Sequence, residues 1–439
     1  MKITVWLSMI IALRFLGLFI VLPMLAVYAG QQAGATPVLI GMAVGGYALT
    51  QMLLQYPLGR LSDRIGRKKI IVGGLVLFAL GSLLCAVSSD ITMLILGRLL
   101  QGAGAISSTV TAMISDFTKE SERSKAMAMM GGAIAMSFVV SMVAGPLLGG
   151  YFGIELLFII TTLLALAAIY IMAAKIPESE AASHRYEFES SLGTILKNPQ
   201  LLRMNGTMFF HSSMMTMAFL IIPLTLTQRY GWHKSELWQV YVPAIVLGFL
   251  FMGLAAVLGE KHNKTKPVFL VSALLFGIAF VLFGQSGGSA LFVTGVLVFF
   301  IGFMMLEPLL QSTTTKIARI HERGAALGVF NTVQFFGVFV GGIAGGWMMQ
   351  YMSLESVGYL LGGVSLFWLL WMAGMKTPLK ASFAYVEGVG EALPYASVLH
   401  AEPGVMDFYL NTKESVLVVK FDPALVEEAD LLAKIEALR

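Results

Sequence analysis

Long apolar runs separated by short polar connections dominate the chain. Each run has roughly the 20 residues that a helix needs to cross a bilayer. The first run is too long for the apolar core of a cleavable signal peptide, so it is predicted to be a span. The pattern therefore predicts twelve membrane-spanning helices, at Val5–Tyr28, Val38–Leu58, Ile70–Ser88, Ile91–Met113, Ala126–Phe152, Ile154–Ala173, Met204–Gln228, Leu237–Leu258, Pro267–Gln285, Ala290–Thr315, Gly324–Gln350 and Ser356–Met375.

Basic residues lie almost entirely on one set of alternate connections between these runs. The densest connection, residues 59–69, reads GRLSDRIGRKK. The opposite set of connections carries only Arg229 and Lys234. Because short loops rich in Lys and Arg stay in the cytoplasm, we expect a multi-pass protein of the plasma (inner) membrane with both termini cytoplasmic.

The composition narrows the function classes. Hydrophobic residues make up 57% of the chain and charged residues 12%, with a net charge of +4. The basic residues lie in short loops rather than on one face of a polar domain, which argues against nucleic-acid binding. Cys85 is the single cysteine, so no disulfide or cysteine-based metal site is expected within one chain. There is no HExxH pair, no Walker A sequence and no nucleophile with its base, so we expect no enzyme, metal or cofactor.

The two groups of six spans repeat each other. Gly59 and Gly259 open basic connections at equivalent places, and Glu122–Arg123 and Glu322–Arg323 have the same offset. Internal repeats of this kind are typical of secondary transporters, whose sites lie between the repeats. The predicted organisation is an amino-terminal half (1–173), a cytoplasmic linker (174–203), a carboxy-terminal half (204–375) and a cytoplasmic domain (376–439).

The last predicted domain has the pattern of a small α+β fold. Met406–Asn411 and Ser415–Phe421 are typical of two strands joined by a tight turn, and a third strand is expected near Ser382–Tyr385. Val426–Leu438 has the spacing of an amphipathic helix. The order is ferredoxin-like. Because so small a core is marginal on its own, we expect the domain to dock on the membrane helices or to form a dimer.

The connection after the second span contains more than positive charge. Asp63 and Arg67 are four residues apart, which places them on one face of a helix. Gly59 and Gly66 allow a tight turn and close packing. The stretch resembles the signature G-x-L-a-D-r-x-G-r-k of the major facilitator superfamily at almost every position. That resemblance implies a charge relay that latches the outward-open state, in which Arg67 pairs with Asp116 and Asp63 faces the amino end of the eleventh span. Alternatively, these charges only set the orientation.

Two other spans resemble motifs of the same superfamily. Arg98 lies well inside the fourth span, where a charge costs at least ~2.5 kcal/mol on insertion scales. Its surroundings are similar to the motif R-x-x-q-G-x-g, whose arginine is linked to proton coupling; alternatively, it is a structural arginine bonded to backbone carbonyls. The fifth span resembles an antiporter signature, which implies export, with Ser141 replacing one glycine. The matching residues are Gly132, Gly145, Pro146 and Gly149.

Further polar residues within the spans are candidates for the proton or substrate site. Glu307 is an acid deep in the tenth span, and proton coupling needs such a group. His211 in the seventh span titrates near neutral pH in its unperturbed state, and Arg14 in the first can neutralise an acid or hold an anionic substrate. Each of the three can instead be a hydrogen-bonded structural group. Asn331 and Gln334 share a face of the eleventh span and can reach a central cavity.

With its carboxy-terminal domain, the chain resembles the YajR-type branch of the superfamily over nearly its whole length. It departs from that branch at Met304 and Gln311, where asparagine and proline are usual. We expect an all-α membrane protein of twelve transmembrane helices in two six-helix halves, the major facilitator fold, plus a small α+β ferredoxin-like domain.

The expected function is proton-coupled antiport that exports small amphipathic or hydrophobic compounds by alternating access. Methionines and aromatic residues dominate the expected cavity, and such surfaces adapt to many ligands. The expected partners are therefore a small-molecule substrate, protons and the lipid bilayer. A proton-coupled uptake symporter for a metabolite or sugar is one alternative. A non-transporting sensor that signals through the carboxy-terminal domain is the other.

Overall fold

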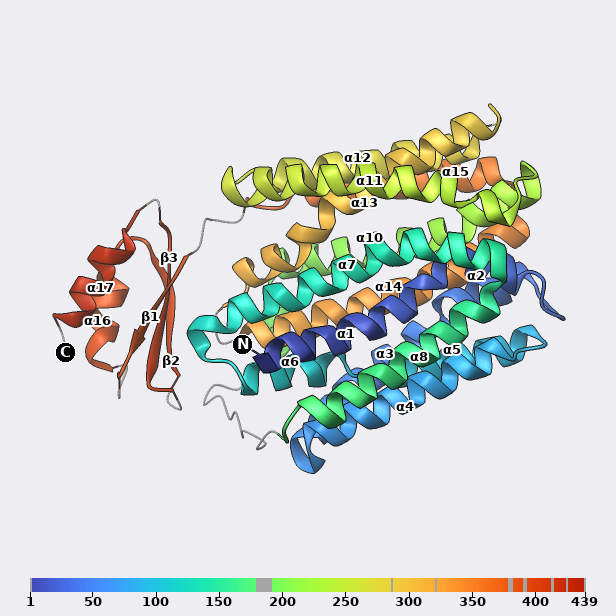
Figure 1. Cartoon of the computed structure of the whole chain (residues 1–439). Helices are drawn as coiled ribbons and strands as arrows, with labels where there is room; N and C mark the ends of the chain where they lie inside the picture. Colours follow the sequence, from blue (N-terminus) through green and yellow to red (C-terminus); the bar gives the residue numbers. More distant parts are fainter. Residues whose placement is uncertain are drawn as a thin grey trace.

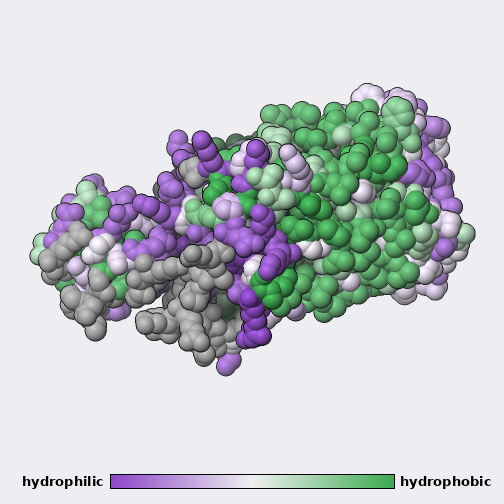
Figure 2. All heavy atoms as spheres, turned by 60° about the horizontal axis from the view of Figure 1, so that its bottom comes forward, coloured by the Kyte–Doolittle hydropathy of each residue, from purple (hydrophilic) through white to green (hydrophobic). Residues whose placement is uncertain are grey.

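The chain forms one helical bundle with a small domain at one end. The computed structural model describes residues 2–178, 192–285, 287–319, 322–377, 382–389, 393–411, 414–423 and 425–437. Within these ranges, twelve helical segments are long and apolar enough to cross a membrane, as predicted. Apolar side chains cover the visible side of the bundle in a broad band (Figure 2). The amino terminus and the small domain lie at the same end (Figure 1), called here the basic end because the Lys- and Arg-rich connections are there.

The amino-terminal half supplies the first six spans, two of which are each built from two helices. A Cβ on Gly102 would lie 1.8 Å from the carbonyl oxygen of Tyr47, so only glycine lets the fourth span pack this closely on the second. The fourth span is interrupted soon afterwards. The elements are α1 (Lys2–Ile20), α2 (Leu22–Ala29), α3 (Pro37–Ile65), α4 (Arg67–Ala86), α5 (Ile91–Ala103), α6 (Ser107–Asp116), α7 (Glu120–Phe152) and α8 (Ile154–Lys175).

The basic stretch after the second span is helical, contrary to the loop that we expected. Helix α3 runs through it as far as Ile65, well beyond the predicted end at Leu58. The break before α4 is Gly66, whose φ of +104° favours glycine. Gly59 lies inside α3, where a Cβ would be 3.2 Å from the Ser108 hydroxyl oxygen. Gly66 therefore makes the turn, and Gly59 gives close packing.

The carboxy-terminal half repeats this arrangement. Helix α7 packs closely on α1 at Gly145, and α14 packs closely on α10 at Gly341. Residues 179–191 of the predicted linker lie outside the described ranges. The elements are α9 (Leu192–Lys197), α10 (Pro199–Leu224), the π-helical turn η1 (Thr225–Arg229), the 3₁₀ turn η2 (Lys234–Glu236), α11 (Trp238–Ala256), the π-helical turn η3 (Val257–Lys261), α12 (Thr265–Gly284), α13 (Ser289–Ile317), α14 (Arg323–Tyr351) and α15 (Leu354–Ala373).

The carboxy-terminal domain is the predicted ferredoxin-like α+β unit. Its elements are β1 (Ser382–Glu387), α16 (Leu393–Ala401), β2 (Val405–Asn411), β3 (Val416–Phe421) and α17 (Glu428–Glu436). The strands form an antiparallel sheet in the order β1-β3-β2. Helices α16 and α17 lie on the side of the sheet away from the bundle (Figure 1). The other face carries a second apolar cluster of Phe383, Tyr385, Tyr409, Val416 and Val418.

Candidate functional site

The two halves are in contact at the end opposite the basic end. A Cβ on Gly41 of α3 would lie 2.0 Å from the carbonyl oxygen of Gly342 in α14, so the two backbones touch. The Lys234 ammonium donates a hydrogen bond of 2.7 Å to the side-chain oxygen of Gln31 across the halves. Small residues at helix contacts permit this approach. The bundle is therefore sealed at that end.

The same helices stand apart toward the basic end. A Cβ on Gly131 or Gly132 of α7 would meet no atom within 4 Å outside its own helix, and the same holds for Gly324 and Gly328 of α14. An opening therefore runs from the basic end into the space between the halves.

Aromatic rings close this opening at mid-depth. Phe138 of α7 and Phe303 of α13 bring their ring centroids to 5.7 Å across the two halves. Phe219 packs against Phe138 from α10. Beside these rings lies a small cavity at the interface, lined by Leu22, Val44, Tyr47, Met215, Thr216, Phe219 and Val338. The sealed region thus begins at an aromatic layer.

Glu307 lies one helical turn from this layer, on the basic side. It follows Phe303 by four residues on α13, so the two side chains share a face. Its side chain is exposed, whereas its neighbours Leu306 and Leu309 are buried. The face that carries Glu307 is therefore the one that borders the opening.

Asn331 and Gln334 lie on the corresponding face of α14. Both are half-buried, and they precede Val338, which packs against Tyr47 and Ala48 of α3 in the amino-terminal half. Spacings of seven and four residues keep all three on one helix face. The two amides therefore border the space between the halves, on the basic side of the contact made by Val338.

His211 is enclosed by aromatic rings. It is 1% exposed, its ring stacks on Phe303 with centroids 4.6 Å apart, and its Nε2 lies 3.3 Å from the Phe303 carbonyl oxygen. The ring of Phe276 makes an edge contact with it, with centroids 6.0 Å apart. This geometry favours the structural alternative for His211, because its described polar contact is with a backbone carbonyl.

Arg98 is buried and hydrogen-bonded within the amino-terminal half. Its Nε donates to the carbonyl oxygen of Ala43 at 3.1 Å and its Nη2 to that of Val44 at 3.4 Å. Its Nη1 donates to the side-chain oxygen of Gln101 at 2.6 Å. All three guanidinium nitrogens thus have acceptors on α3 or α5. This is the geometry of the structural alternative, in which the arginine binds backbone carbonyls.

Arg14 has fewer acceptors. Its Nη2 donates to the side-chain oxygen of Gln51 at 3.0 Å, and its Nη1 to the Ser107 hydroxyl at 3.4 Å. The rings of Phe15 and Phe78 lie 5.5 and 5.4 Å from the guanidinium carbon. Arg14 has 0% exposure, so its side chain does not reach the opening in this conformation.

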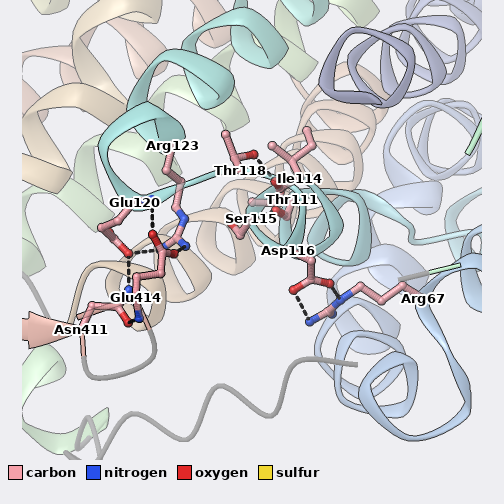
Figure 3. Close-up of polar contacts among 10 residues, drawn as sticks. All are labelled: Arg67, Thr111, Ile114, Ser115, Asp116, Thr118, Glu120, Arg123, Asn411 and Glu414. Carbon is pink, nitrogen blue, oxygen red and sulfur yellow. Dashed lines mark hydrogen bonds and ion pairs between the residues drawn. The ribbon is translucent and has the colours of Figure 1, made fainter. Parts of the chain in front are cut away.

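The charge-relay residues lie at the basic end of α3, α4 and α6. The Arg67 guanidinium forms an ion pair with Asp116 (Figure 3), and its Nη1 lies 2.9 Å from an Asp63 oxygen. Arg67 and Asp116 are buried, whereas the Asp63 side chain is 57% exposed. No hydrogen bond or ion pair joins Asp63 to the described part of α14 in this conformation, whereas the expected contact belongs to the outward-open state. The reason is geometric, since α14 stands away from the other half at Gly324 and Gly328.

A second ion pair occupies the equivalent place in the carboxy-terminal half. Glu260 of η3 pairs with Lys316 near the end of α13 and also accepts a hydrogen bond from the Ser312 hydroxyl. Lys316 follows Asp116 by the same offset that relates Gly59 to Gly259, and it has the opposite charge. The sequence did not predict this pair. The offset of the repeat matches Lys316 to Asp116, but it matches Glu260 to Arg60 rather than to Arg67.

The antiporter-like residues of the fifth span mainly pack α7 on α1. The Ser141 hydroxyl donates to the Leu16 carbonyl oxygen at 3.0 Å. A Cβ on Gly145 would lie 2.3 Å from the Ile20 carbonyl oxygen, and one on Gly149 would lie 2.9 Å from a Leu157 methyl carbon. Pro146 lies within α7, one turn beyond Met142. Gly132 instead borders the opening.

Comparison with known proteins gives consistent results. The sequence profile of the Major Facilitator Superfamily matches residues 7–342. The chain is 36% identical to the inner membrane transport protein YajR of Escherichia coli (strain K12), over 97% of this chain and 95% of that protein. It is 28% identical to multidrug resistance protein 2 of Bacillus subtilis (strain 168), over 76% of this chain and 86% of that one. The crystal structure of the nucleoside transporter NupG shares the fold, with a TM-score of 0.64 and 16% identity over 86% of this chain and all of that one.

Proposed function

The chain belongs to the major facilitator superfamily, and on that premise we propose that it is a proton-coupled antiporter that exports small amphipathic or hydrophobic compounds across the inner membrane. Its relatives are membrane transporters, so the chain is a multi-pass transporter and not an enzyme. The proposal adds the coupling ion, the direction and the substrate class. Transport follows alternating access between the two halves.

The observation that carries the proposal is the position of Glu307. It is an acid within a membrane-spanning helix, exposed on a face that borders the opening. Acidic groups at such depth are costly and mark ion or substrate pathways. We assign to Glu307 the binding of a proton, or of a cationic substrate in exchange for it. Asn331 and Gln334 supply neutral hydrogen-bonding groups on the neighbouring helix.

The substrate class follows from the lining of the opening. Phe138 and Phe303 bring aromatic rings together across the two halves, one helical turn from the carboxyl group of Glu307. Aromatic faces attract cations. Compounds with an apolar body and a positive charge suit both features. Relatives that carry the name multidrug resistance protein support this choice.

We place the basic end in the cytoplasm, following the positive-inside rule. This conformation is then the inward-open one, and export begins when a compound enters from the cytoplasm. The charge relay belongs to the other conformation of the cycle. Closing the basic end would bring α14 toward α3, where the helix dipole at Arg323 favours the exposed carboxylate of Asp63.

A flux measurement in proteoliposomes tests the proposal. Purified protein is reconstituted, and uptake of a panel of amphipathic cations is followed under an imposed pH gradient. An antiporter accumulates the compound when the vesicle interior is acidic, and Glu307→Gln lowers this gradient-driven uptake roughly tenfold or more, equivalent to ~1.4 kcal/mol. Exchange of labelled for unlabelled compound without a gradient moves no net proton. It persists in Glu307→Gln when Glu307 binds only the proton, and it falls when Glu307 also binds the cationic substrate.

Glu355→Gln is the matched control, since it makes the same change at an exposed position in the first turn of α15. It leaves uptake unchanged. Accumulation driven by an acidic exterior would instead identify an uptake symporter. Full gradient-driven uptake by Glu307→Gln would remove Glu307 from the proposal.

A further inference from the structure

The carboxy-terminal domain contacts both halves of the bundle at the basic end. Its sheet turns the face without helices toward the membrane helices (Figure 1). On this face lie the aromatic side chains of β1 and β2 and, from β3, Lys420, which is 4% exposed. A buried lysine must find acceptors. The acceptors of Lys420 belong to the bundle, so this face is the docking surface.

The contact with the amino-terminal half is made by the turn between β2 and β3. The Glu414 carboxylate accepts a hydrogen bond of 2.8 Å from the backbone N–H of Glu120, at the first turn of α7. It also pairs with the Arg123 guanidinium at 3.4 Å. The Asn411 amide donates to the Glu120 carboxylate at 2.9 Å (Figure 3). A carboxylate at a helix amino terminus is stabilised by the helix dipole.

The contact with the carboxy-terminal half is made by β3 and β1. The Lys420 ammonium donates to the carbonyl oxygens of Lys316 and Ala318 at 2.6 and 3.2 Å, at the end of α13. The Arg323 guanidinium, at the start of α14, lies 4.0 Å from the centre of the Phe383 ring. This half is thus held by two contacts that are chemically unlike those on the other half.

The two anchoring sites on the bundle are equivalent in the repeat. Arg123 and Arg323 occupy matching positions at the starts of α7 and α14. The sheet therefore bridges two connections that the repeat relates to each other. These connections approach or separate when the halves move. Glu414 lies in the turn just before β3 and Lys420 near the other end of the strand, and the strand residues from Val416 to Lys420 alone span roughly 13 Å at the usual rise per residue.

A strand cannot shorten to follow the movement of its anchors. We propose that the carboxy-terminal domain is a strut, which holds the basic ends of the two halves apart and favours the conformation open at that end. Closure of the basic end requires release of the strut from at least one half. The domain thereby sets the balance between the two conformations of the transport cycle.

A distance measurement between the halves tests the strut. Spin labels are attached to Arg64→Cys on α3 and Lys261→Cys on η3, both exposed at the basic end, in a Cys85→Ala background. Double electron–electron resonance on the full chain then gives the populations of long and short distances between the two labels. Glu414→Ala and Lys420→Met each raise the short-distance population, by roughly threefold or more.

The double variant distinguishes a strut from simple domain loss. A strut anchored at one end holds nothing apart, so Glu414→Ala/Lys420→Met shifts the populations no further than either single change. The control is Glu402→Ala/Lys434→Met, which removes an ion pair of 2.7 Å inside the domain and away from the bundle. It leaves the distances unchanged. Unchanged distances in the docking variants, or an equal shift in the control, would overturn the proposal.

Discussion

Each half has an ion pair between the connection after its second span and the end of its fourth span, and the two pairs have opposite polarity. In the amino-terminal half, Arg67 after the second span binds Asp116 at the end of the fourth. In the carboxy-terminal half, Glu260 after the eighth span binds Lys316 at the end of the tenth. Both halves therefore have a salt bridge between the same two connections, with the positive and negative side chains on opposite sides.

The two ion pairs differ in how deeply their side chains are buried. The side chains of the first pair are 5% and 4% exposed, and Asp63 adds a second carboxylate to Arg67. Those of Lys316 and Glu260 are 22% and 40% exposed. Breaking a buried pair leaves an uncompensated charge, whereas an exposed pair contributes little. Removing one charge from the buried pair should therefore lower the free energy of unfolding more than removing one charge from the exposed pair.

The largest expected effect is that of Asp116→Asn. The change leaves the buried Arg67 guanidinium without its main partner and lowers the free energy of unfolding by about 3 kcal/mol. Glu260→Gln, the matched change in the other half, lowers it by no more than about 1 kcal/mol. Reversible unfolding in mixed micelles measures both. Equal losses would show that burial does not distinguish the two pairs.

A smaller effect on stability, but a clear one on transport, is expected for Asp63→Asn. Asp63 is 57% exposed here, and an exposed pair at i,i+4 contributes about 0.5 kcal/mol or less. If Asp63 meets the start of α14 only when the basic end closes, its loss slows transport roughly tenfold, or ~1.4 kcal/mol. Unfolding and flux are measured on the same preparation.

Glu260→Gln provides the contrast in transport as well, because it alters the equivalent connection without touching the relay. It is expected to keep most of the flux. A full transport rate in Asp63→Asn, with the orientation of the protein unchanged, would reduce the relay to a signal for membrane orientation. A loss of stability as large as that of Asp116→Asn would instead assign Asp63 a structural role in this conformation.

Much of the fold was predictable because hydropathy reports burial in lipid directly. The twelve spans and the three strands follow from apolar runs and alternation, and the structure confirms them. The second span was predicted to end at Leu58 because charged residues follow it. In the structure, α3 continues through these polar residues to Ile65, beyond the apolar segment.

The candidate site was less accessible to sequence reasoning. The motif resemblance singles out Arg67 and its partner Asp116, and depth singles out Glu307, but most other partners of these side chains have no pattern in the sequence. Arg98 binds backbone carbonyls, which have no sequence signature. Glu414 contacts Glu120, almost three hundred positions away, and no local pattern reports so remote a pairing. In the Glu260–Lys316 pair, the offset of the repeat indicates Lys316, the match of Asp116, but not its partner Glu260.

The smallest expected effect is a pH dependence at one anchor of the strut. Burial, with Arg323 beside it, lowers the pKa of Lys420 to about 8, and Asp407 opposes the shift. A released Lys420 regains its ordinary pKa near 10.5. Between these values the released domain binds more protons than the docked one, so docking becomes more favourable as the pH rises.

The spin-label distances between Arg64→Cys and Lys261→Cys measure this effect between pH 7 and pH values approaching 10. The long-distance population is expected to rise with pH, by a few-fold at most. Lys420→Met removes this rise, and the difference between the two proteins cancels pH effects that arise elsewhere in the chain. A long-distance population that falls with pH in the parent relative to Lys420→Met would mean that the charged ammonium, rather than its burial, dominates at this anchor.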